Sequence, residues 1–452
     1  MVSRKIWVMV AASVLIAAAV YMLSTLLFEL NTLIVDFLSA GTFITSMTEF
    51  FTLFMVILVI RYFVLIIFSY LEHLDNSRKQ NSEVAVSQLN PASDKNLPFV
   101  TIIVPAYNEG KIIKTAIRSL LEIDYPNYEV LVVDDGSTDD TYERAREMVN
   151  VSKKCVVTVL TKTNGGKANA LNTGMACAKG DFILNMDGDS KLSPNTLRDC
   201  IRHFDDPKIG AVAGNVKVVN RENLITRVQA LEYVEGLALA RMAQSYSRVV
   251  NIIPGPLGMF RKSVLKQIHG YDDDTFAEDC DLTLKLLLSG WHIVYEPRAI
   301  AWVESPSHMT DLLKQRYRWT RGILQAIKKH AWSLWHPHKA GLNGFILWYM
   351  LFEGVLCPIL NVAGNIFFVW IGFKYGVSIL VAFWWLQLTI LDLVTASYCV
   401  IVEKEDTLLI VYALVFRAFY QLLIDVAKIF ASIEEMVGTK MSWGKLEREG
   451  KL

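Results

Sequence analysis

The sequence predicts an α/β domain with a mostly parallel sheet, inserted between N-terminal and C-terminal transmembrane helices. Three observations carry this prediction. Hydrophobic residues make up 53% of the 452-residue chain, which is a high share for a soluble protein. Long apolar stretches lie near both ends of the chain. Between them, short apolar runs alternate with helical patterns for more than 200 residues, which is typical of a parallel sheet covered by helices.

Charge and cysteine usage narrow the function classes. The 45 Lys and Arg residues balance the 45 Asp and Glu residues, so no overall field attracts nucleic acid. This argues against a nucleic-acid-binding protein. The six cysteines are scattered without a CxxC pair, which predicts reduced structural thiols rather than a disulfide framework or a zinc site.

Two apolar stretches in the first 75 residues, 6–28 and 49–70, are each long enough to cross a hydrocarbon core of roughly 30 Å as a helix. A cleaved signal peptide is the alternative for the first stretch, but its apolar region is too long and a second span follows. The loop 29–48 carries no Lys or Arg, so the positive-inside rule predicts that both ends of this hairpin are cytoplasmic. Basic residues flank the hairpin instead: Arg4, Lys5, Arg78 and Lys79.

Residues 76–96 are polar and lack periodicity, which predicts a linker before a central domain at residues 97–320. Apolar runs in that domain predict strands: FVTIIVPAY, YEVLVVDDG, CVVTVLT and DFILNMDGD. Helical patterns separate them at residues 111–121, 139–149 and 167–178. The helical stretches 226–247 and 323–335 suit either a membrane interface or internal packing, and residues 321–342 are predicted as an interfacial helix region.

The membrane signal returns in residues 343–432. Its apolar stretches are 343–373, 377–402 and 407–431. Glu353 and Pro358 interrupt the first stretch, which is therefore either one long tilted helix or two short ones. Basic residues in the tail 433–452 favour a cytoplasmic C-terminus and hence an even number of C-terminal crossings, and both two and four stay open. These basic residues are Lys440, Lys445, Arg448 and Lys451.

Ionisable residues occur inside the predicted spans. A charge that faces lipid costs about 2.5 to 3.5 kcal/mol on insertion scales, so these side chains should face one another or a hydrated path. Helix-packing ion pairs and a polar conduit for a hydrophilic product are both open interpretations. The residues are Arg61, Glu353, Asp392, Arg417 and Asp425.

Polar motifs follow three predicted strands, where open parallel sheets bind their ligands. Tyr107 offers a face for a planar base, and Glu109 and Asp135 can accept hydrogen bonds from ribose hydroxyls or a base N–H. The sequence Asp-Gly-Ser-Thr is also ordinary turn chemistry, so a plain turn is the alternative there. The motifs are PAYNE at 105–109, DDGSTDDT at 134–141 and DGD at 187–189.

Asp187 and Asp189 directly follow the apolar run FILNM. Two carboxylates so close would repel each other in a low-dielectric cleft unless a divalent cation lies between them and an anionic ligand. Solvated loop carboxylates are the alternative. Lys167 opens a helix after two glycines, so its ammonium and the helix N-terminal amides can meet phosphate. The GxxxxGK[ST] spacing of a P-loop is missing from the sequence.

Three later motifs add polar groups. FAEDCDLTLKL carries Glu278, Asp279 and Asp281 at a predicted helix start, where capping by the helix dipole is the alternative explanation. QRYRWTRG carries Arg316, Arg318 and Arg321 around Trp319, where a basic interfacial belt is the alternative. PGPLGMF could approach an acceptor closely through Gly255 and Gly258, with a plain loop as the alternative.

Taken in order, DDG, DGD, AED and QRYRW between flanking spans resemble the processive inverting glycosyltransferases of family 2. This family contains the synthases of hyaluronan, chitin, cellulose and poly-N-acetylglucosamine, and the resemblance covers nearly the whole chain. GYDDDTFAEDCDLTLKL and DGDS are most similar to bacterial poly-β-1,6-N-acetylglucosamine synthases. SWGKLEREG resembles the gating segment of this group, in which a tryptophan, here Trp443, folds over the nucleotide.

The resemblance implies a GT-A fold, which is Rossmann-like, and a UDP-sugar donor, with UDP-N-acetylglucosamine favoured. It assigns uridine to Tyr107, Glu109 and Asp135, and the diphosphate to Lys167. It assigns Mg2+ or Mn2+ to Asp189, with Asp187 assisting.

The same resemblance assigns the catalytic step to Asp279 as general base, with Glu278 beside it. Gln315, Arg318 and Trp319 would form the acceptor floor, with Arg318 near the leaving diphosphate. Gly255 and Trp443 belong to the acceptor and gating part of the site.

The implied partners are the growing polysaccharide, the lipid bilayer and a small membrane accessory subunit, and the implied location is the plasma (inner) membrane with a cytoplasmic catalytic domain. Two alternatives stay open. A non-processive enzyme would load one sugar onto a polyprenyl phosphate lipid carrier. A transporter or membrane scaffold would only sense nucleotide-sugars, which an intact Glu278–Asp279 pair disfavours.

Overall fold

The computed structural model describes residues 25, 29, 42–89, 97–152, 154–336, 342–375 and 378–439. The predicted first span, residues 6–28, falls almost entirely outside these residues. The part of the predicted tail from residue 440 onward, including Trp443, also lies outside them.

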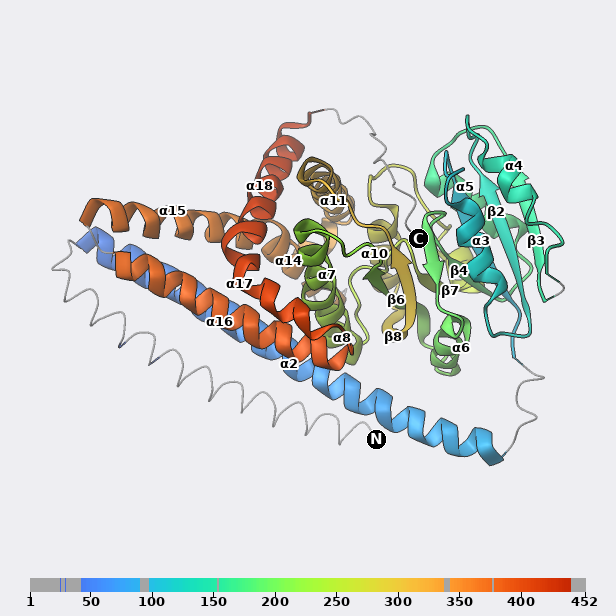
Figure 1. Cartoon of the computed structure of the whole chain (residues 1–452), viewed down its shortest axis with the longest axis horizontal. Helices are drawn as coiled ribbons and strands as arrows, with labels where there is room; N and C mark the ends of the chain where they lie inside the picture. The colour runs from blue at the N-terminus through green and yellow to red at the C-terminus, as the bar shows by residue number, and fades with distance from the viewer. Residues whose placement is uncertain are drawn as a thin grey trace.

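A mixed sheet of eight strands forms the centre of the domain, in the order β3-β2-β1-β4-β7-β6-β8-β5 (Figure 1). The first four strands of this order are parallel to one another, as are β6 and β8, whereas the pairs β4–β7, β6–β7 and β5–β8 are antiparallel. The predicted mostly parallel sheet is therefore confirmed. The strands are β1 (Val100–Ala106), β2 (Tyr128–Asp134), β3 (Val156–Thr161), β4 (Phe182–Asn185), β5 (Ser190–Leu192), β6 (Ile209–Val218), β7 (Gly258–Arg261) and β8 (His292–Val303).

Helices cover both faces of this sheet, because alternate side chains of a strand point to opposite faces. In β1, Ile103 packs in one apolar core with residues of α5 and α10, whereas Ile102 and Val104 pack in another with residues of α3 and α6. Burial on both faces explains the continuous apolar runs of β1 and β2. The helices are α3 (Ile113–Leu121), α4 (Thr141–Arg146), α5 (Lys167–Cys177), α6 (Thr196–Ile201), the 3-10 helix η2 (Arg202–Asp205), α9 (Lys262–Gln267) and α10 (Glu278–Leu288).

The helix α2 (Thr42–Leu89) contains the predicted second span and continues through most of the residues predicted as a linker, up to Leu89. The sequence holds no Gly or Pro between residues 76 and 89 to stop it. Beyond the apolar part, α2 also packs on α8 (Leu239–Tyr246), where the Ser245 hydroxyl donates to Glu72 Oε1 at 2.9 Å. This docking gives the extended helix a partner.

A layer of helices joins the sheet to the apolar helices. It contains α7 (Leu224–Glu232), the π-helix η3 (Tyr233–Ala238), α8, α11 (Met309–Lys329) and α12 (Trp332–Trp335). The predicted domain boundary at residue 320 falls inside α11, and the division into domains stays a prediction.

The C-terminal region consists of long apolar helices and a bent segment. Its elements are α14 (Leu342–Leu351), η4 (Phe352–Leu356), α15 (Cys357–Tyr375), α16 (Ser378–Val402), η5 (Thr407–Tyr412), α17 (Ala413–Val415), η6 (Phe416–Gln421) and α18 (Leu422–Val437). Residues 343–374 form one helix, so the alternative of two short helices is excluded. The π-helical turn η4 ends at Leu356, two residues before Pro358, and its shifted backbone hydrogen bonds help the helix to accommodate this proline.

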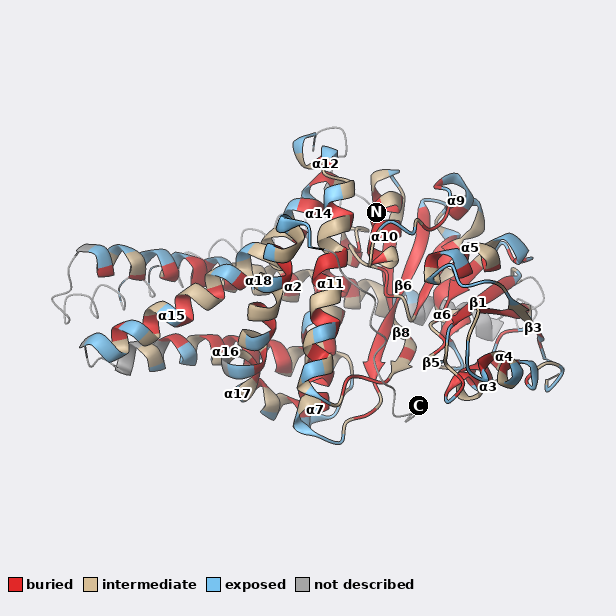
Figure 2. Cartoon of the chain, turned by 90° about the horizontal axis from the view of Figure 1, so that it is seen from above, coloured by how far each residue is buried: buried red, intermediate tan, exposed pale blue. Residues whose placement is uncertain are grey.

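In the described part of the chain, three helices are long and apolar enough to cross a membrane. A bent pair, 407–415 with 419–437, would add a fourth as a broken span or form a re-entrant loop, so the number of crossings stays a prediction. These helices extend away from the sheet, and exposed positions alternate with buried ones along them (Figure 2). Apolar residues such as Ile366 and Ile401 are among the exposed ones. The three helices are Phe43–Lys79, Asn343–Lys374 and Trp384–Val402.

The ionisable residues inside these helices face polar partners, as expected. Arg61 pairs with Glu353. Arg417 pairs with Asp392, with Nε 3.0 Å from Oδ2. Asp425 accepts from the Asn361 amide at 2.6 Å.

Candidate active site

The carboxyl ends of β1, β2 and β4 lie side by side, since Ala106 pairs with Asp134 and β4 pairs with β1 on its other edge. The three predicted motifs therefore converge on one edge of the sheet. The turn at Gly188 also packs on the turn after β1, because a Cβ added to Gly188 would lie 3.1 Å from the Pro105 carbonyl oxygen. The structure thus brings the loop of Asp187 and Asp189 next to the loop of Tyr107 and Glu109.

Lys167 is the link between distant motifs. Its Nζ lies 2.7 Å from Asp187 Oδ1 and 2.8 Å from Glu278 Oε1. Burial raises the pKa of Asp187, and the neighbouring Asp189 charge adds to this effect. Burial alone would also raise the pKa of Glu278, but the Lys167 ammonium holds that pKa below its usual value. A single cation therefore joins the strand-tip carboxylates to the start of α10.

Asp279 differs from its neighbour. Burial and then the negative charge of Glu278 raise its pKa to about 6. Its Oδ1 accepts the backbone N–H of Cys280 at 2.8 Å, which fixes the side chain at the first turn of α10. A carboxylate with such a pKa is ionised near neutral pH and binds a proton more readily than an exposed aspartate does.

Gly255 completes a cavity that Lys167, Asp187, Glu278 and Asp279 line together. A Cβ added at Gly255 would lie 2.9 Å from Lys167 Nζ and 3.2 Å from Asp187 Oδ2. The loop after residue 253 therefore approaches these charged groups closely at Gly255, where a side chain would have to displace them. The cavity is also lined by Asn185, Tyr271 and Leu282.

Asp135 lies at the same edge, but its carboxylate accepts hydrogen bonds from other residues of the chain. It is buried and accepts from Lys162 Nζ at 2.6 Å, from the Gly165 N–H at 3.0 Å and from the Gly166 N–H at 2.7 Å. These bonds hold the loop that leads into α5 and so place Lys167. Its predicted contact with uridine stays a prediction.

Tyr107 is 40% exposed at the end of β1, so its ring is accessible. Asn108 has a φ of 54°, which turns the chain sharply after Tyr107. The backbone N–H of Glu109 donates to Thr141 Oγ1 at 2.7 Å. These contacts tie the loop after β1 to the loop after β2.

The residues of QRYRW lie on α11, which packs against the start of α10. A Cβ added at Gly322 would lie 2.7 Å from both Cβ and N of Ala277, the residue before Glu278. Burial tends to raise the pKa of Glu278, and Lys167 lowers it. The charge of Arg318 adds a smaller lowering effect, so Arg318 lies close to Glu278. Helix α11 therefore places Arg318 beside the acidic end of α10.

Two arginines of this motif do not form the interfacial belt that was the alternative. Arg316 is buried, with Nη2 2.5 Å from Glu232 Oε2, and donates to Gln315 Oε1 at 2.6 Å. Its guanidinium stacks over the Trp319 ring at 4.3 Å. Arg321 is also buried, with Nε 2.8 Å from Glu435 Oε2 on α18. Both cations hold elements together instead of facing a membrane surface.

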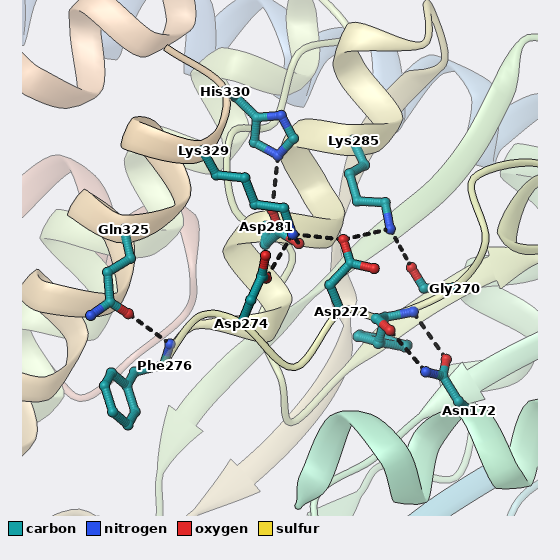
Figure 3. Close-up of polar contacts among 11 residues, drawn as sticks. Asn172, Gly270, Asp272, Asp274, Phe276, Asp281, Lys285, Gln325, Lys329 and His330 are labelled. Atoms are coloured by element: carbon teal, nitrogen blue, oxygen red, sulfur yellow. Dashed lines mark hydrogen bonds and ion pairs between the residues drawn. The ribbon is translucent and has the colours of Figure 1, made fainter. Parts of the chain in front are cut away.

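Asp187 and Asp189 are the carboxylates at the strand tip that could hold a divalent cation. Carboxylate oxygens are the ligands that Mg2+ and Mn2+ prefer, so the donor chemistry fits. A second acidic group, Asp272, Asp274 and Asp281, surrounds the ammonium of Lys329 (Figure 3). In this second group the Lys329 ammonium therefore takes the position between the carboxylates that a metal ion could otherwise occupy.

Sequence reasoning missed several polar side chains around the site. Asn185 donates to the Tyr271 hydroxyl, and Asn172 contacts both backbone groups of Tyr271. Lys329 was also missed. The triple aspartate in GYDDDTF was the available signal, but a sequence pattern does not reveal a lysine partner 57 residues away.

Residues 98–322 match the family described as "Glycosyltransferase like family 2". The poly-beta-1,6-N-acetyl-D-glucosamine synthase of Staphylococcus epidermidis is 32% identical over 244 residues, which cover 54% of this chain and 59% of that protein. The synthase of the same name from Staphylococcus aureus (strain COL) is 30% identical over 272 residues, which cover 59% of this chain and 64% of that protein. The matched region thus spans about 60% of the length of these relatives.

Among solved structures, a mannosyltransferase from Pyrobaculum calidifontis in complex with GDP-Man and Mn2+ superposes with a TM-score of 0.56. The match covers 83% of this chain and 100% of that one at 20% identity, so it bears on the fold alone. The comparisons confirm the predicted resemblance and the predicted GT-A fold class.

Proposed function

Through residues 98–322 the chain belongs to glycosyltransferase family 2, and on this premise we propose that it extends a β-linked polysaccharide from a UDP-sugar donor with inversion at the anomeric carbon. The favoured donor is UDP-N-acetylglucosamine, because the relatives reported above are named for that sugar. The single observation that carries the proposal is the contact of Lys167 with both Asp187 and Glu278, beside Asp279 with a pKa of about 6.

The nucleotide part of the donor is assigned to the loops after β1 and β2. The exposed ring of Tyr107 suits stacking on uracil, and Glu109 suits hydrogen bonding to the ribose. Asp135 acts there mainly by holding the loop before Lys167, whose ammonium then faces the diphosphate.

Asp187 and Asp189 would hold a divalent cation, and the carboxylate donors fit either Mg2+ or Mn2+. Such a cation stabilises the negative charge that develops on the leaving UDP. Lys167 and Arg318 add positive charge near the same point, because Lys167 contacts Asp187 and Arg318 lies close to Glu278.

Asp279 is the proposed general base. The acceptor hydroxyl oxygen forms a bond to the anomeric carbon while the bond from that carbon to the UDP oxygen breaks. The hydroxyl proton goes to Asp279, and the electron pair of the broken bond leaves with UDP. Attack from the face opposite UDP inverts the configuration.

The acceptor end of the polysaccharide is assigned to Gln315, Arg318, Trp319 and Gly255. Because Arg316 covers one face of the indole of Trp319, the sugar would stack on the other face. Arg321 donates to the carbonyl oxygen of Thr439 at 2.6 Å, so the tail begins beside α11. This supports the proposed role of Trp443 in covering the nucleotide.

A run of polar side chains from α11 into the apolar helices supports passage of the polymer across the membrane. It starts at Arg316 and Glu232, which also binds the Tyr420 hydroxyl at 2.5 Å. It continues with the pairs of Arg417 with Asp392 and of Arg61 with Glu353. Ion pairs of this kind also serve helix packing.

Glu235 favours the conduit over mere packing. It is buried close to Asp392 and Arg417, and neither of its carboxylate oxygens has a hydrogen-bond partner among the described residues. Glu235, Glu353 and Arg417 each lie on a π-helical turn, η3, η4 and η6 respectively. Such turns are frequent at functional sites. On this proposal the domain faces the cytoplasm and the chain crosses the plasma (inner) membrane several times.

The proposal is tested by incubating membranes that contain the protein with labelled UDP-N-acetylglucosamine, UDP-glucose and UDP-glucuronic acid. A high-molecular-mass polymer from one donor is expected, and EDTA should stop its formation. A label found only in a lipid-extractable monosaccharide would favour the carrier enzyme instead. Tight UDP binding without turnover would favour a sensor.

A further inference from the structure

A group of charged side chains lies where α11 ends (Figure 3), and none of them lines the cavity at the strand tips. Lys329 Nζ lies 2.6 Å from Asp272 Oδ2, 2.7 Å from Asp274 Oδ1 and 3.0 Å from Asp281 Oδ2. An ammonium carries three N–H donors, so each donor of Lys329 has one carboxylate. We call these four side chains the Lys329 clasp.

Two more side chains support the clasp. His330 Nε2 lies 2.8 Å from Asp281 Oδ1, and Lys285 Nζ lies 3.1 Å from Asp272 Oδ2. Asp281 is fully buried, and a buried carboxylate that lost its cation would be strongly destabilised. Burial alone would raise the pKa of Asp272, but Lys329 and Lys285 hold it below its usual value. The two lysines therefore favour the ionised form of Asp272.

The clasp joins two helices that the proposed reaction uses. Asp281 lies two residues after Asp279 in the first turn of α10. Asp272 and Asp274 lie on the loop that leads into Glu278. Lys329 ends α11, the helix that carries the proposed acceptor residues. The Lys329 ammonium thus connects α11 to the first turn of α10, which carries the proposed general base, and to the loop before it.

The rest of this loop is anchored to the donor side of the site. Asn172 of α5 accepts the Tyr271 N–H at 3.0 Å and donates to the Tyr271 carbonyl at 2.8 Å. Asn185, at the end of β4, donates to the Tyr271 hydroxyl. Gln325 of α11 accepts the Phe276 N–H at 3.0 Å. The loop is therefore fixed to the elements of Lys167 and Asp187 at one end and to α11 at the other.

We propose that Lys329 is a positioning residue that sets the distance between Asp279 and the acceptor residues of α11. The inference rests on the proposed function. Among the residues that the structure describes, Lys329 bonds to Asp272, Asp274 and Asp281, none of which is assigned to the donor. Its loss should therefore change the placement of the base and leave the nucleotide loops in place.

The test uses the full chain in membranes or detergent. Lys329→Met should lower kcat by about 10- to 100-fold, as expected for a shift of the reacting groups by about 1 Å. The Kd for UDP should stay within about two-fold, since the change affects placement and not donor binding. Lys329→Arg keeps the charge and should retain most of the turnover. The Lys329 side chain is 25% exposed, so n-propylammonium should reach the gap in Lys329→Ala and restore part of kcat.

Two neighbours serve as matched controls. Lys328 and Asp273 are exposed residues beside members of the clasp, and Lys328→Met and Asp273→Asn should keep the wild-type kcat. If Lys329→Met does not fold, Asp274→Asn makes the same test, because Asp274 is 56% exposed and loses one contact to Lys329.

Wild-type kcat in Lys329→Met would overturn the inference. In its place, wild-type kcat in Asp274→Asn would do the same. A lowered kcat that neither arginine nor n-propylammonium restores would also overturn it, since the loss would then be general. Failure of the proposed function is a different result, namely a wild-type protein that transfers no sugar.

Discussion

At the scale of single residues, the environment of Asp279 separates it from the other carboxylates of the site. Lys167 contacts Asp187 and Glu278, whereas burial and the Glu278 charge raise the pKa of Asp279 to about 6. Neighbouring carboxylates with different pKa values are typical of sites that divide proton transfer from charge stabilisation.

Asp279→Asn should abolish sugar transfer and leave UDP affinity nearly unchanged, because only the base is lost. In the wild-type protein, kcat should fall as the pH drops below about 6, where Asp279 becomes protonated. The pH profile of kcat and the Kd for UDP by calorimetry check both expectations. Retained polymer synthesis by the variant would refute the assignment of the base.

The same substitution should change stability in the opposite direction. A carboxyl whose folded-state pKa is raised favours folding at low pH, and this contribution is lost as the pH rises from about 4 through about 6. Asp279→Asn removes the buried charge, so its melting temperature should exceed that of the wild type at pH 7.5, and the difference should vanish near pH 4. A lower melting temperature of the variant at pH 7.5 would contradict the burial argument.

Gly255→Ala should impair activity more than stability. The new Cβ would meet the ends of two flexible side chains, Lys167 at 2.9 Å and Asp187 at 3.2 Å, which can move away. Their movement breaks the contact that carries the proposed function. Steady-state kinetics should show a kcat lower by about 10-fold or more, and the melting temperature should change little. An unchanged kcat would remove Gly255 from the site.

At the scale of elements, the packing of α11 on α10 brings the acceptor residues to the base. Gly322 allows this approach, because its added Cβ would lie 2.7 Å from both Cβ and backbone N of Ala277. Backbone atoms cannot yield as a flexible side chain does.

Gly322→Ala should therefore destabilise the protein by about 1 to 3 kcal/mol and lower kcat, because α11 must move off α10. Gly236→Ala is the control, since the nearest atom to its added Cβ is 4.0 Å away. Thermal unfolding and kcat of the two variants check this expectation. Equal behaviour of both variants would show that α11 does not depend on the close approach.

Elements also show what the sequence could predict. Continuous apolar runs predicted the strands β1, β2, β3 and β4. Because these strands are parallel, their polar ends lie together, as with Asp135 and Asp187. The extension of α2 to Leu89 was missed, because docking on α8 is a tertiary contact. The contacts of Lys167 with Glu278 and of Lys329 with Asp281 were missed for the same reason.

At the scale of the whole molecule, the sheet domain and the apolar helices are joined by buried charges. Lys217 of β6 lies 3.0 Å from Glu405, which follows α16, and Arg221 lies 2.6 Å from the same carboxylate. Inside the apolar region, Arg61 of α2 pairs with Glu353 of η4. These pairs connect segments far apart in the chain.

Glu353→Gln should destabilise the protein by about 3 to 5 kcal/mol, because it leaves the charge of Arg61 buried without its partner. Replacing both residues by leucine should recover most of that loss, since neither charge then remains. Thermal unfolding in detergent measures both variants. If the double variant is as unstable as Glu353→Gln, the two charged groups stabilise the fold beyond neutralising each other. A hydrated conduit would require such a contribution.

The strand-tip carboxylates and the start of α10 are proposed to form one centre for a cation and a sugar nucleotide. Anomalous scattering from crystals grown with Mn2+ and UDP tests this claim most directly. The predicted result is a manganese peak at Asp187 and Asp189, with UDP beside Lys167 and Asp279. A peak at Asp272, Asp274 and Asp281, or UDP bound away from Lys167, would contradict it.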